Sequence, residues 1–389
     1  MFKVCIDATP IRGKLTGIGV YTLNLINALY QLQETEDFSL DIYFHPSVKN
    51  WLKRNLSTPQ PLSQYSQVSC VPIPVSLANI FAKYSPFILP FFEKYLEKPD
   101  LIQGTDHYIF PHSQAKQIMT IHDLTFIKFP NYSTNIVKGY LERIKRCLSW
   151  TDAIITFSEN TKQDIVELLN IDPNIIYVTP QASRYSPNYL NRQLLYDHRN
   201  VIDYYLYKPY FLFVSTLEPR KNILTLIEAY EYLKHTYKIP HQLILIGKKG
   251  WNYKDILEKI ESSQFKEDIQ HLDYVSDELV AIFYSQAEAF VYPSFYEGFG
   301  LPVLEAMTLG SPVITSYNSS LPEVAGDAAL YIDPHNYYEL AEIMLKVVDN
   351  STLRKEMIEK GKKQANTFSW QRTAQTSLNV YKQILSNNS

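Results

Sequence analysis

The sequence has little cysteine and no strong excess of charge of either sign. Its three cysteines, Cys5, Cys70 and Cys147, are far apart and odd in number. This spacing excludes a complete disulfide framework and shows no metal-ligand pattern, and it is typical of reduced thiols in the cytoplasm. The formal net charge of −3 gives no support for nucleic-acid binding, which usually accompanies a strongly basic balance.

Long apolar runs and several catalytic motifs are also missing. No run approaches the ~18 apolar residues of a membrane-spanning helix. The N-terminus has the pattern of a first strand and lacks that of a signal peptide. The motifs D-x-D, H-E-x-x-H, G-x-S-x-G and the P-loop do not occur. We therefore expect a cytoplasmic protein without a bound metal.

Strand-like apolar runs alternate with amphipathic segments along almost the whole chain, which is typical of α/β folds with parallel sheets. Because 389 residues exceed what one core usually organises, we expect two domains. A polar, tyrosine-rich segment separates two series of runs and is the best candidate for a linker. The runs cover residues 3–7, 40–44, 101–102, 117–121, 153–157 and 175–178, and then 210–214, 242–246, 269–272, 289–292, 312–315 and 329–332.

The most informative stretch, residues 293–307, places Glu297 and Glu305 eight residues apart around a glycine turn. The stretch follows an apolar strand pattern and leads into a helix predicted over residues 301–309. Glycines in a strand-to-helix turn let a ligand approach backbone N–H groups, which take an anion, while carboxylates accept bonds from hydroxyls. A nucleotide sugar has both kinds of group. The plainer alternative is a crossover whose glutamates are merely solvated.

The complete string resembles the E-x7-E signature of retaining glycosyltransferases of family 4, and the resemblance continues through residues 311–316 to 321–326. It implies the α/β GT-B fold, in which two Rossmann-like parallel-sheet domains face a cleft. The implied parts are an acceptor-binding domain (1–185), a linker (186–209), a nucleotide-sugar-binding domain (210–368) and a helix that returns to the first domain (369–389). In this family Glu297 would orient the sugar hydroxyls and Glu305 the ribose hydroxyls. The amides of Gly298, Phe299, Gly300 and Leu301 would hold the diphosphate and sugar.

A second stretch, residues 216–222, follows the first strand of the second series and places Arg220 and Lys221 before a helix. Two cations at a strand's carboxyl end can hold a diphosphate and stabilise its charge as the glycosidic bond breaks. Taken alone, the stretch also fits a solvated turn. The resemblance makes Lys221 a phosphate ligand. Thr216 stands where many members carry Arg, so Arg220 would substitute or the clamp would rest mainly on Lys221.

Other strand ends carry weaker signals. Gly17 and Gly19 open a helix, but the third glycine of a dinucleotide fingerprint is missing. The resemblance places this turn near the donor phosphates and lets His122 reach the donor sugar. The remaining candidates are Asp123 and, more weakly, Asp106 for the acceptor, and Gly247, Tyr274 and Val275 for the donor. Each of these also fits an ordinary structural loop.

The strings around residues 216–222 and 247–251 look most like mannosyltransferase-type members of the family. GDP-mannose is therefore the first donor expected, with UDP-sugars left open and no cofactor beside the donor. The acceptor would be a glycan or a lipid-linked glycan. The alternatives are a catalytically silent nucleotide-sugar-binding subunit, and an epimerase or phosphorylase on the same fold. Intact Glu297, Glu305 and Lys221 argue against the silent subunit.

Residues 138–150 form a basic amphipathic pattern in the expected acceptor domain, and residues 87–92 are rich in aromatics. Family members with lipid-linked acceptors often dock on membranes through this domain. Peripheral contact with the inner face of the membrane is therefore one hypothesis. An ordinary surface helix whose apolar face lies in the core is the other.

Overall fold

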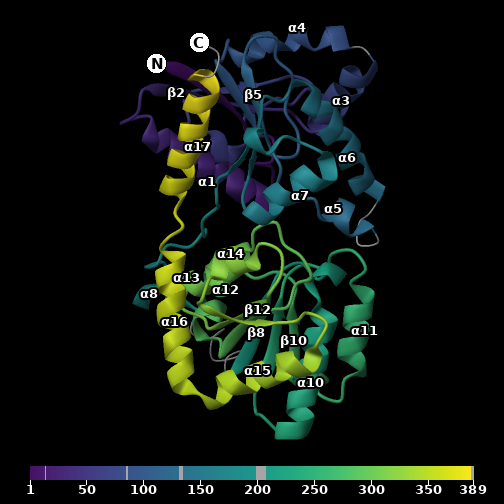
Figure 1. Cartoon of the computed structure of the whole chain (residues 1–389), viewed down its shortest axis with the longest axis vertical. Helices are drawn as coiled ribbons and strands as arrows, with labels where there is room; N and C mark the ends of the chain where they lie inside the picture. The colour runs from purple at the N-terminus through teal and green to yellow at the C-terminus, as the bar shows by residue number, and fades with distance from the viewer. Residues whose placement is uncertain (14, 85, 131–134, 199–206, 387–389) are drawn as a thin grey trace. The chain divides into compact units, whose positions relative to one another are not determined.

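The structure is a computed structural model that describes residues 1–389 except 14, 85, 131–134, 199–206 and 387–389. The chain forms two compact units, drawn in Figure 1. The first consists of Met1–Gln181 and Ser369–Ser389, and the second of Ala182–Phe368. Each unit contains its own parallel sheet. The predicted α/β class is confirmed in both halves.

The first unit contains a seven-stranded parallel sheet in the order β3-β2-β1-β4-β5-β6-β7. Except for β3, its strands are largely buried apolar runs, as parallel strands covered on both faces require. Five of the seven closely match apolar runs that the sequence predicts as strands. Strand β4 is two residues longer than the predicted run, residues 101–102. The strands are β1 (Phe2–Asp7), β2 (Phe38–Phe44), β3 (Val68–Cys70), β4 (Leu101–Gly104), β5 (Lys116–Thr120), β6 (Ala153–Thr156) and β7 (Ile176–Val178). Only β3 was not predicted, because it is short and only half-buried.

The helices of the first unit include a segment from the end of the chain. Helix α17 (Trp370–Ser386) packs on α1 (Gly17–Leu32), and the Tyr381 hydroxyl is hydrogen-bonded to the Gln103 side chain on β4. The final helix therefore belongs to the first unit. The others are α2 (Val48–Leu52), α3 (Val75–Tyr84), α4 (Pro90–Glu93), α5 (Thr125–Lys128), α6 (Asn135–Cys147) and α7 (Glu159–Leu169).

The second unit contains a six-stranded parallel sheet in the order β10-β9-β8-β11-β12-β13. All six strands lie where the sequence predicts them. They are β8 (Tyr210–Val214), β9 (Gln242–Ile246), β10 (Ile269–Leu272), β11 (Ala289–Tyr292), β12 (Val313–Ser316) and β13 (Ala329–Ile332). The chain order reverses between β8 and β11, and ligands bind beyond the carboxyl ends of strands at such a switch point.

The helices of the second unit begin with α8 (Arg192–Asp197), which lies inside the segment predicted as a linker. Residues 182–209 are grouped with the second unit, although 199–206 of that segment lie outside the described residues. The remaining α-helices in the described residues of this unit are α10 (Ile223–Tyr237), α11 (Lys254–Ser262), α12 (Asp277–Gln286), α13 (Leu301–Thr308), α14 (Leu321–Ala325), α15 (Tyr337–Asp349) and α16 (Ser351–Ala365). Helix α13 ends one residue before its predicted end.

Candidate active site

The carboxyl ends of β8 and β11 bring Glu297 together with Arg220 and Lys221. Lys221 Nζ donates to Glu297 Oε1 over 2.7 Å, and Arg220 Nη1 donates to Oε2 over 3.0 Å. The Ser294 hydroxyl donates to the same Oε1 over 2.7 Å. Both cations come from the short helix η7 (Pro219–Lys221). Three residues singled out from two separate stretches thus form one contact cluster.

This cluster is buried, and its charges set the protonation of the carboxylate. Glu297 is 7% exposed and Lys221 6%. Burial alone would raise the pKa of Glu297, but the charges of Arg220 and Lys221 and the hydrogen bonds from Lys221 and Ser294 lower it to about 2. Burial and the charge of Arg220 lower the pKa of Lys221, while Glu297 opposes that shift. Glu297 is therefore a fixed anion at neutral pH and a poor proton donor.

The hydrogen bonds of Glu297 leave one direction open for a ligand. A carboxylate offers about four lone-pair positions. Oε1 already accepts from Lys221 and Ser294, whereas within the described part of the chain Oε2 accepts only from Arg220. Oε2 is therefore the oxygen that can accept a further hydroxyl.

The side chains of Ser319 and Ser320 stabilise the turn between Glu297 and α13. Ser320 Oγ donates to the Glu297 and Phe299 carbonyls over 2.9 Å and 2.8 Å, and Ser319 Oγ accepts from Glu297 N over 3.0 Å. Gly300 caps the helix with φ of +110°, a conformation that L side chains rarely adopt. The turn is thus fixed in a shape that brings residues 298–301 to the helix N-terminus.

Glu305 has a partner that the sequence did not reveal. Arg184 Nε donates to Oε1 over 2.8 Å and Nη2 to Oε2 over 3.1 Å, while Arg184 Nη1 bonds Asp277 over 2.9 Å. Glu305 is only 4% exposed. Burial raises its pKa, and the Arg184 charge opposes the rise. One lone pair on each Glu305 oxygen remains for a ligand hydroxyl, so Arg184 orients the carboxylate without saturating it.

The candidates of the first unit lie at the carboxyl edge of its sheet. His122 Nε2 lies 2.8 Å from the Thr105 carbonyl, which assigns its proton to that nitrogen, and burial lowers its pKa. Asp123 Oδ1 accepts from Thr125 N over 3.0 Å, so this carboxylate stabilises the turn that follows β5. Asp106 Oδ1 is buried without a hydrogen-bond partner. The sequence argument missed Asp7, at the end of β1, whose pKa burial raises to about 6.

The remaining candidates are placed at strand ends without direct evidence of a ligand. A Cβ on Gly247 would lie 1.9 Å from the Ser215 carbonyl, so close backbone packing already explains that glycine. Gly17 has open space around it, whereas Gly19 packs against Pro10 and Leu15. Thr216 and Tyr274 are exposed and Val275 is half-buried. In the described residues, no group of three or more His, Cys, Asp or Glu side chains could hold a metal ion.

The two Rossmann-like sheets define the GT-B class of α/β proteins, and solved structures share that fold. Sucrose-phosphate synthase of Thermosynechococcus elongatus aligns over 100% of both chains with a TM-score of 0.74 at 19% identity. Anabaena HepE in complex with UDP and glucose aligns over 98% of this chain and 100% of that one, with a TM-score of 0.71 at 14% identity.

Sequence comparison then identifies the family. Residues 197–364 match the family model described as Glycosyl transferases group 1. O-antigen chain mannosyltransferase B of Escherichia coli is 31% identical over 391 aligned residues, which cover 98% of this chain and 99% of the relative. This chain belongs to the group 1 glycosyl transferases, and it is a glycosyltransferase.

Replacing Arg184 tests whether it orients Glu305 or blocks it. We expect Arg184→Ala to weaken binding of GDP or UDP about tenfold, because hydrogen bonds to charged groups contribute ~1.5–3 kcal/mol. Without the opposing charge the pKa of Glu305 rises further. The loss should therefore grow as pH falls, since a protonated Glu305 offers fewer acceptor sites. Calorimetry at several pH values measures both effects.

The matched control is Arg184→Lys, which keeps the charge but not the paired bonds. Its affinity for GDP or UDP should lie between those of the wild type and Arg184→Ala. Tighter nucleotide binding by Arg184→Ala would mean that Arg184 competes with the ligand, and the positioning role would be wrong.

Proposed function

We propose that the chain transfers a hexose, with retention of configuration and without a metal ion, from a nucleotide-diphosphate sugar to an acceptor hydroxyl. The observation that carries this proposal is the buried contact of Glu297 with Arg220 and Lys221 at the switch point of the second sheet. It combines an oriented hydroxyl acceptor with two cations, which are the groups needed beside a sugar joined to a diphosphate. Glu305 would accept from the ribose hydroxyls.

The donor that we propose first is GDP-mannose. Its support is the similarity to O-antigen chain mannosyltransferase B over nearly the full length of both chains. UDP-sugars are the second candidate, because a structure of the same fold holds UDP and glucose. The acceptor would be a glycan or a lipid-linked glycan.

The proposed mechanism follows from the state of Glu297. Retaining glycosidases use two carboxyl groups, ~5–5.5 Å apart, one of which attacks as a nucleophile. Here the carboxylate is tied to two cations and its pKa is lowered, so it is a weak nucleophile. The acceptor hydroxyl would instead attack from the side on which the nucleotide leaves, and a phosphate oxygen would take its proton. Arg220, Lys221 and the amides at the start of α13 would stabilise the departing diphosphate, and His122 would contact the donor sugar.

A catalytically silent nucleotide-sugar-binding subunit and an epimerase on the same fold are the alternatives. A silent subunit would bind nucleotide and release none from a nucleotide sugar. Release of nucleoside diphosphate in the presence of an acceptor extract therefore separates transfer from silent binding. Conversion of the donor into its epimer would identify the third activity.

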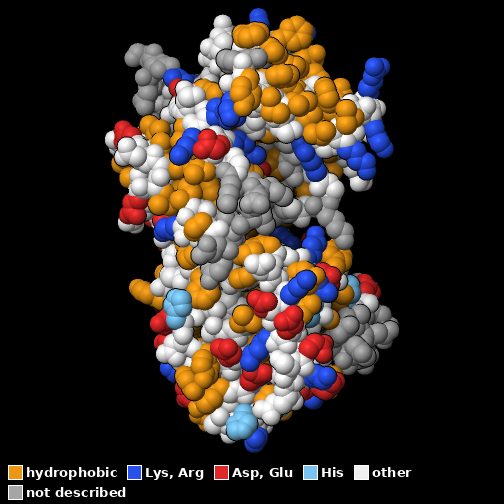
Figure 2. All heavy atoms as spheres, turned by 90° about the vertical axis from the view of Figure 1, so that its right-hand side faces the viewer, with side chains coloured by type: hydrophobic (Ala, Val, Ile, Leu, Met, Phe, Trp, Pro, Cys, Tyr) orange, Lys and Arg blue, Asp and Glu red, His pale blue; other side chains and the backbone are white. Residues whose placement is uncertain are grey.

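Contact with a membrane surface is a further part of the proposal. None of the helices in the described residues is long and apolar enough to cross a membrane. The first unit, however, exposes Tyr84, Phe87 and Phe91 at 70%, 78% and 65%. Figure 2 shows apolar side chains gathered on the upper unit, with Lys and Arg side chains at the border. In the predicted basic stretch Ile144 and Cys147 are buried, so α6 directs part of its apolar face into the core.

The two glutamates should differ in what they contribute. We expect Glu305→Ala to weaken GDP or UDP binding at least about tenfold, because ribose hydroxyls lose their acceptor. Glu297→Ala should lower kcat more than nucleotide affinity, because Glu297 orients the sugar. Calorimetry and donor hydrolysis measure the two quantities. Exposed Glu359→Ala is the control, and equal loss of nucleotide affinity in both variants would contradict these roles.

Lys221 and metal chelation test the source of charge stabilisation. We expect Lys221→Ala to lower kcat of donor hydrolysis by about 10²-fold or more, because charge on the leaving diphosphate grows in the transition state. Exposed Lys346→Ala should leave kcat unchanged. Wild-type activity should survive EDTA. Inactivation by EDTA that Mg²⁺ or Mn²⁺ reverses would overturn the metal-free mechanism.

Vesicle binding tests the membrane contact. The chain should co-sediment with vesicles of phosphatidylglycerol and phosphatidylcholine at low salt and be released as salt rises, because screening weakens surface attraction. Phe87→Ser with Phe91→Ser should reduce the bound fraction, whereas Leu224→Ser on the second unit should not. Absence of co-sedimentation at low salt would exclude this surface as a membrane contact.

A further inference from the structure

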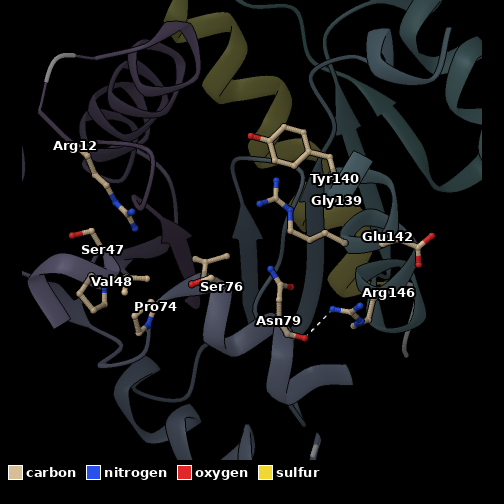
Figure 3. Close-up of a pocket in the computed structure, with 13 residues that line it drawn as sticks. Arg12, Ser47, Val48, Pro74, Ser76, Asn79, Gly139, Tyr140, Glu142 and Arg146 are labelled. Atoms are coloured by element: carbon tan, nitrogen blue, oxygen red, sulfur yellow. Dashed lines mark hydrogen bonds between the residues drawn. The ribbon is translucent and has the colours of Figure 1, made fainter. Parts of the chain in front are cut away.

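The first unit contains a pocket of about 420 Å³ that the proposed donor chemistry does not use. Three arginines line it, one from the loop after β1 and two from α6. Figure 3 shows Arg12 on one side, Tyr140 and Arg146 on the other, and Ser76 and Asn79 of α3 between them. The lining residues are Arg12, Pro46, Ser47, Val48, Pro74, Val75, Ser76, Asn79, Gly139, Tyr140, Glu142, Arg143 and Arg146.

Backbone carbonyls hold the three guanidinium groups in place. Arg12 Nη2 donates to the His45 carbonyl over 2.7 Å, Arg143 Nε to the His107 carbonyl over 3.2 Å, and Arg146 Nη1 to the Asn79 carbonyl over 2.8 Å. The Tyr140 ring lies under the Arg143 guanidinium at 4.4 Å. A guanidinium carries five N–H donors. These contacts therefore fix each group and leave most donors of Arg12 and Arg146, and the Nη1 donors of Arg143, for a ligand.

The positive charge in this pocket is not neutralised by contact with acids. Among the described residues no carboxylate lies within ion-pair distance of Arg12, Arg143 or Arg146. Glu142 belongs to the lining, but Figure 3 shows its carboxylate pointing away from the other labelled side chains. Asp7 and Asp106 act on Arg12 only through longer-range attraction.

One donor in this group is already buried without a partner. Arg143 Nη2 is inaccessible to solvent and makes no hydrogen bond. A buried, unsatisfied donor on a charged group is destabilising. Because Nε is bonded to the His107 carbonyl and Nη2 is inaccessible, Nη1 is the nitrogen of Arg143 that remains for a ligand.

We propose that this pocket binds a phosphate or diphosphate group carried by the acceptor. Guanidinium groups pair with phosphate oxygens through two parallel bonds, and three such groups offer more donors than a single carboxylate can accept. The Ser47 and Ser76 hydroxyls and the Asn79 amide add neutral partners to the lining. The proposal rests on the proposed function only in naming the acceptor as the carrier of the anion.

The surroundings of the pocket favour an acceptor with an apolar tail. Helix α3, which contributes Ser76 and Asn79 to the lining, also exposes Ile80 at 49% and Tyr84 at 70%. An anionic head in the pocket would thus sit beside exposed apolar side chains of the same helix. A phosphate-bearing lipid combines these two chemistries.

Binding of inorganic pyrophosphate to the full chain tests the pocket directly. The proposed diphosphate clamp of the second unit would also bind pyrophosphate, so the measurement is made in the Lys221→Ala background. We expect pyrophosphate binding in this background to be weakened at least tenfold by adding Arg143→Ala and Arg146→Ala. Arg54→Ala removes the same charge from an exposed position of the same unit and should leave binding unchanged. Arg146→Lys keeps the charge but not the paired bonds and should bind with intermediate affinity.

Two outcomes would overturn the proposal. Complete loss of pyrophosphate binding in Lys221→Ala alone would mean that no second site exists. Equal affinity with and without Arg143 and Arg146, in variants with unchanged thermal unfolding, would place the site elsewhere. The affinity of Arg143→Ala with Arg146→Ala for GDP and UDP is measured as well. If it is unchanged, the proposed donor site is intact, and a failure of the pocket proposal is distinct from a failure of the proposed function.

Vesicles distinguish the two sources of the phosphate. Phosphatidylglycerol vesicles that displace pyrophosphate from the pocket would assign it to a bilayer headgroup and contradict an acceptor-borne anion. The acceptor assignment predicts that such vesicles leave pyrophosphate binding unchanged. It also predicts that Arg143→Ala with Arg146→Ala raises KM for the acceptor at least tenfold, while donor hydrolysis without acceptor keeps its rate.

Discussion

The buried carboxylate of Glu297 is the charge on which the ligand edge of the second unit depends. It joins η7 after β8 to the loop after β11, and both of its oxygens accept bonds from cations. Removing one partner of a buried ion pair leaves a charge without compensation, which is strongly destabilising. The position of the loop, the pKa of the carboxylate and the direction in which Oε2 can still accept a bond all follow from this single set of contacts.

Glu305 belongs to the same sequence motif but has a different electrostatic environment. Glu297 contacts two cations, and their attraction outweighs its burial, so its pKa falls. Burial is the largest influence on Glu305 and raises its pKa. Asp277 adds to the rise, while the charge and hydrogen bonds of Arg184 and the hydroxyl of Tyr284 oppose it. Two glutamates eight residues apart are therefore suited to different tasks. Glu297 is a permanent anion beside the proposed sugar position, and Glu305 is an acceptor whose charge depends on Arg184.

The sequence predicted features that arise from nearby residues and missed those that arise from distant ones. Twelve strands were predicted because buried parallel strands are apolar runs. Strand β3 was missed because its side chains are half-exposed. Glu297, Arg220 and Lys221 were found because each follows a strand end directly. Arg184 lies in an irregular segment 121 residues before its partner Glu305. The arginine pocket combines Arg12 with Arg143 and Arg146, and no local pattern links positions that the fold alone brings together.

The two units use arginine in opposite ways. In the second unit Arg184 contacts the carboxylates of Glu305 and Asp277, so its charge is largely compensated before any ligand arrives. Such pairs orient oxygen acceptors toward hydroxyls. In the first unit Arg12, Arg143 and Arg146 contact carbonyls, which fix their geometry but cancel no charge. A carbonyl-held guanidinium keeps its net charge for an anion, because a dipole offsets less of it than a carboxylate does. The carboxylate partners of Arg184 thus suit its surroundings to ligand hydroxyls, whereas the carbonyl partners of Arg12, Arg143 and Arg146 leave charge for a phosphate.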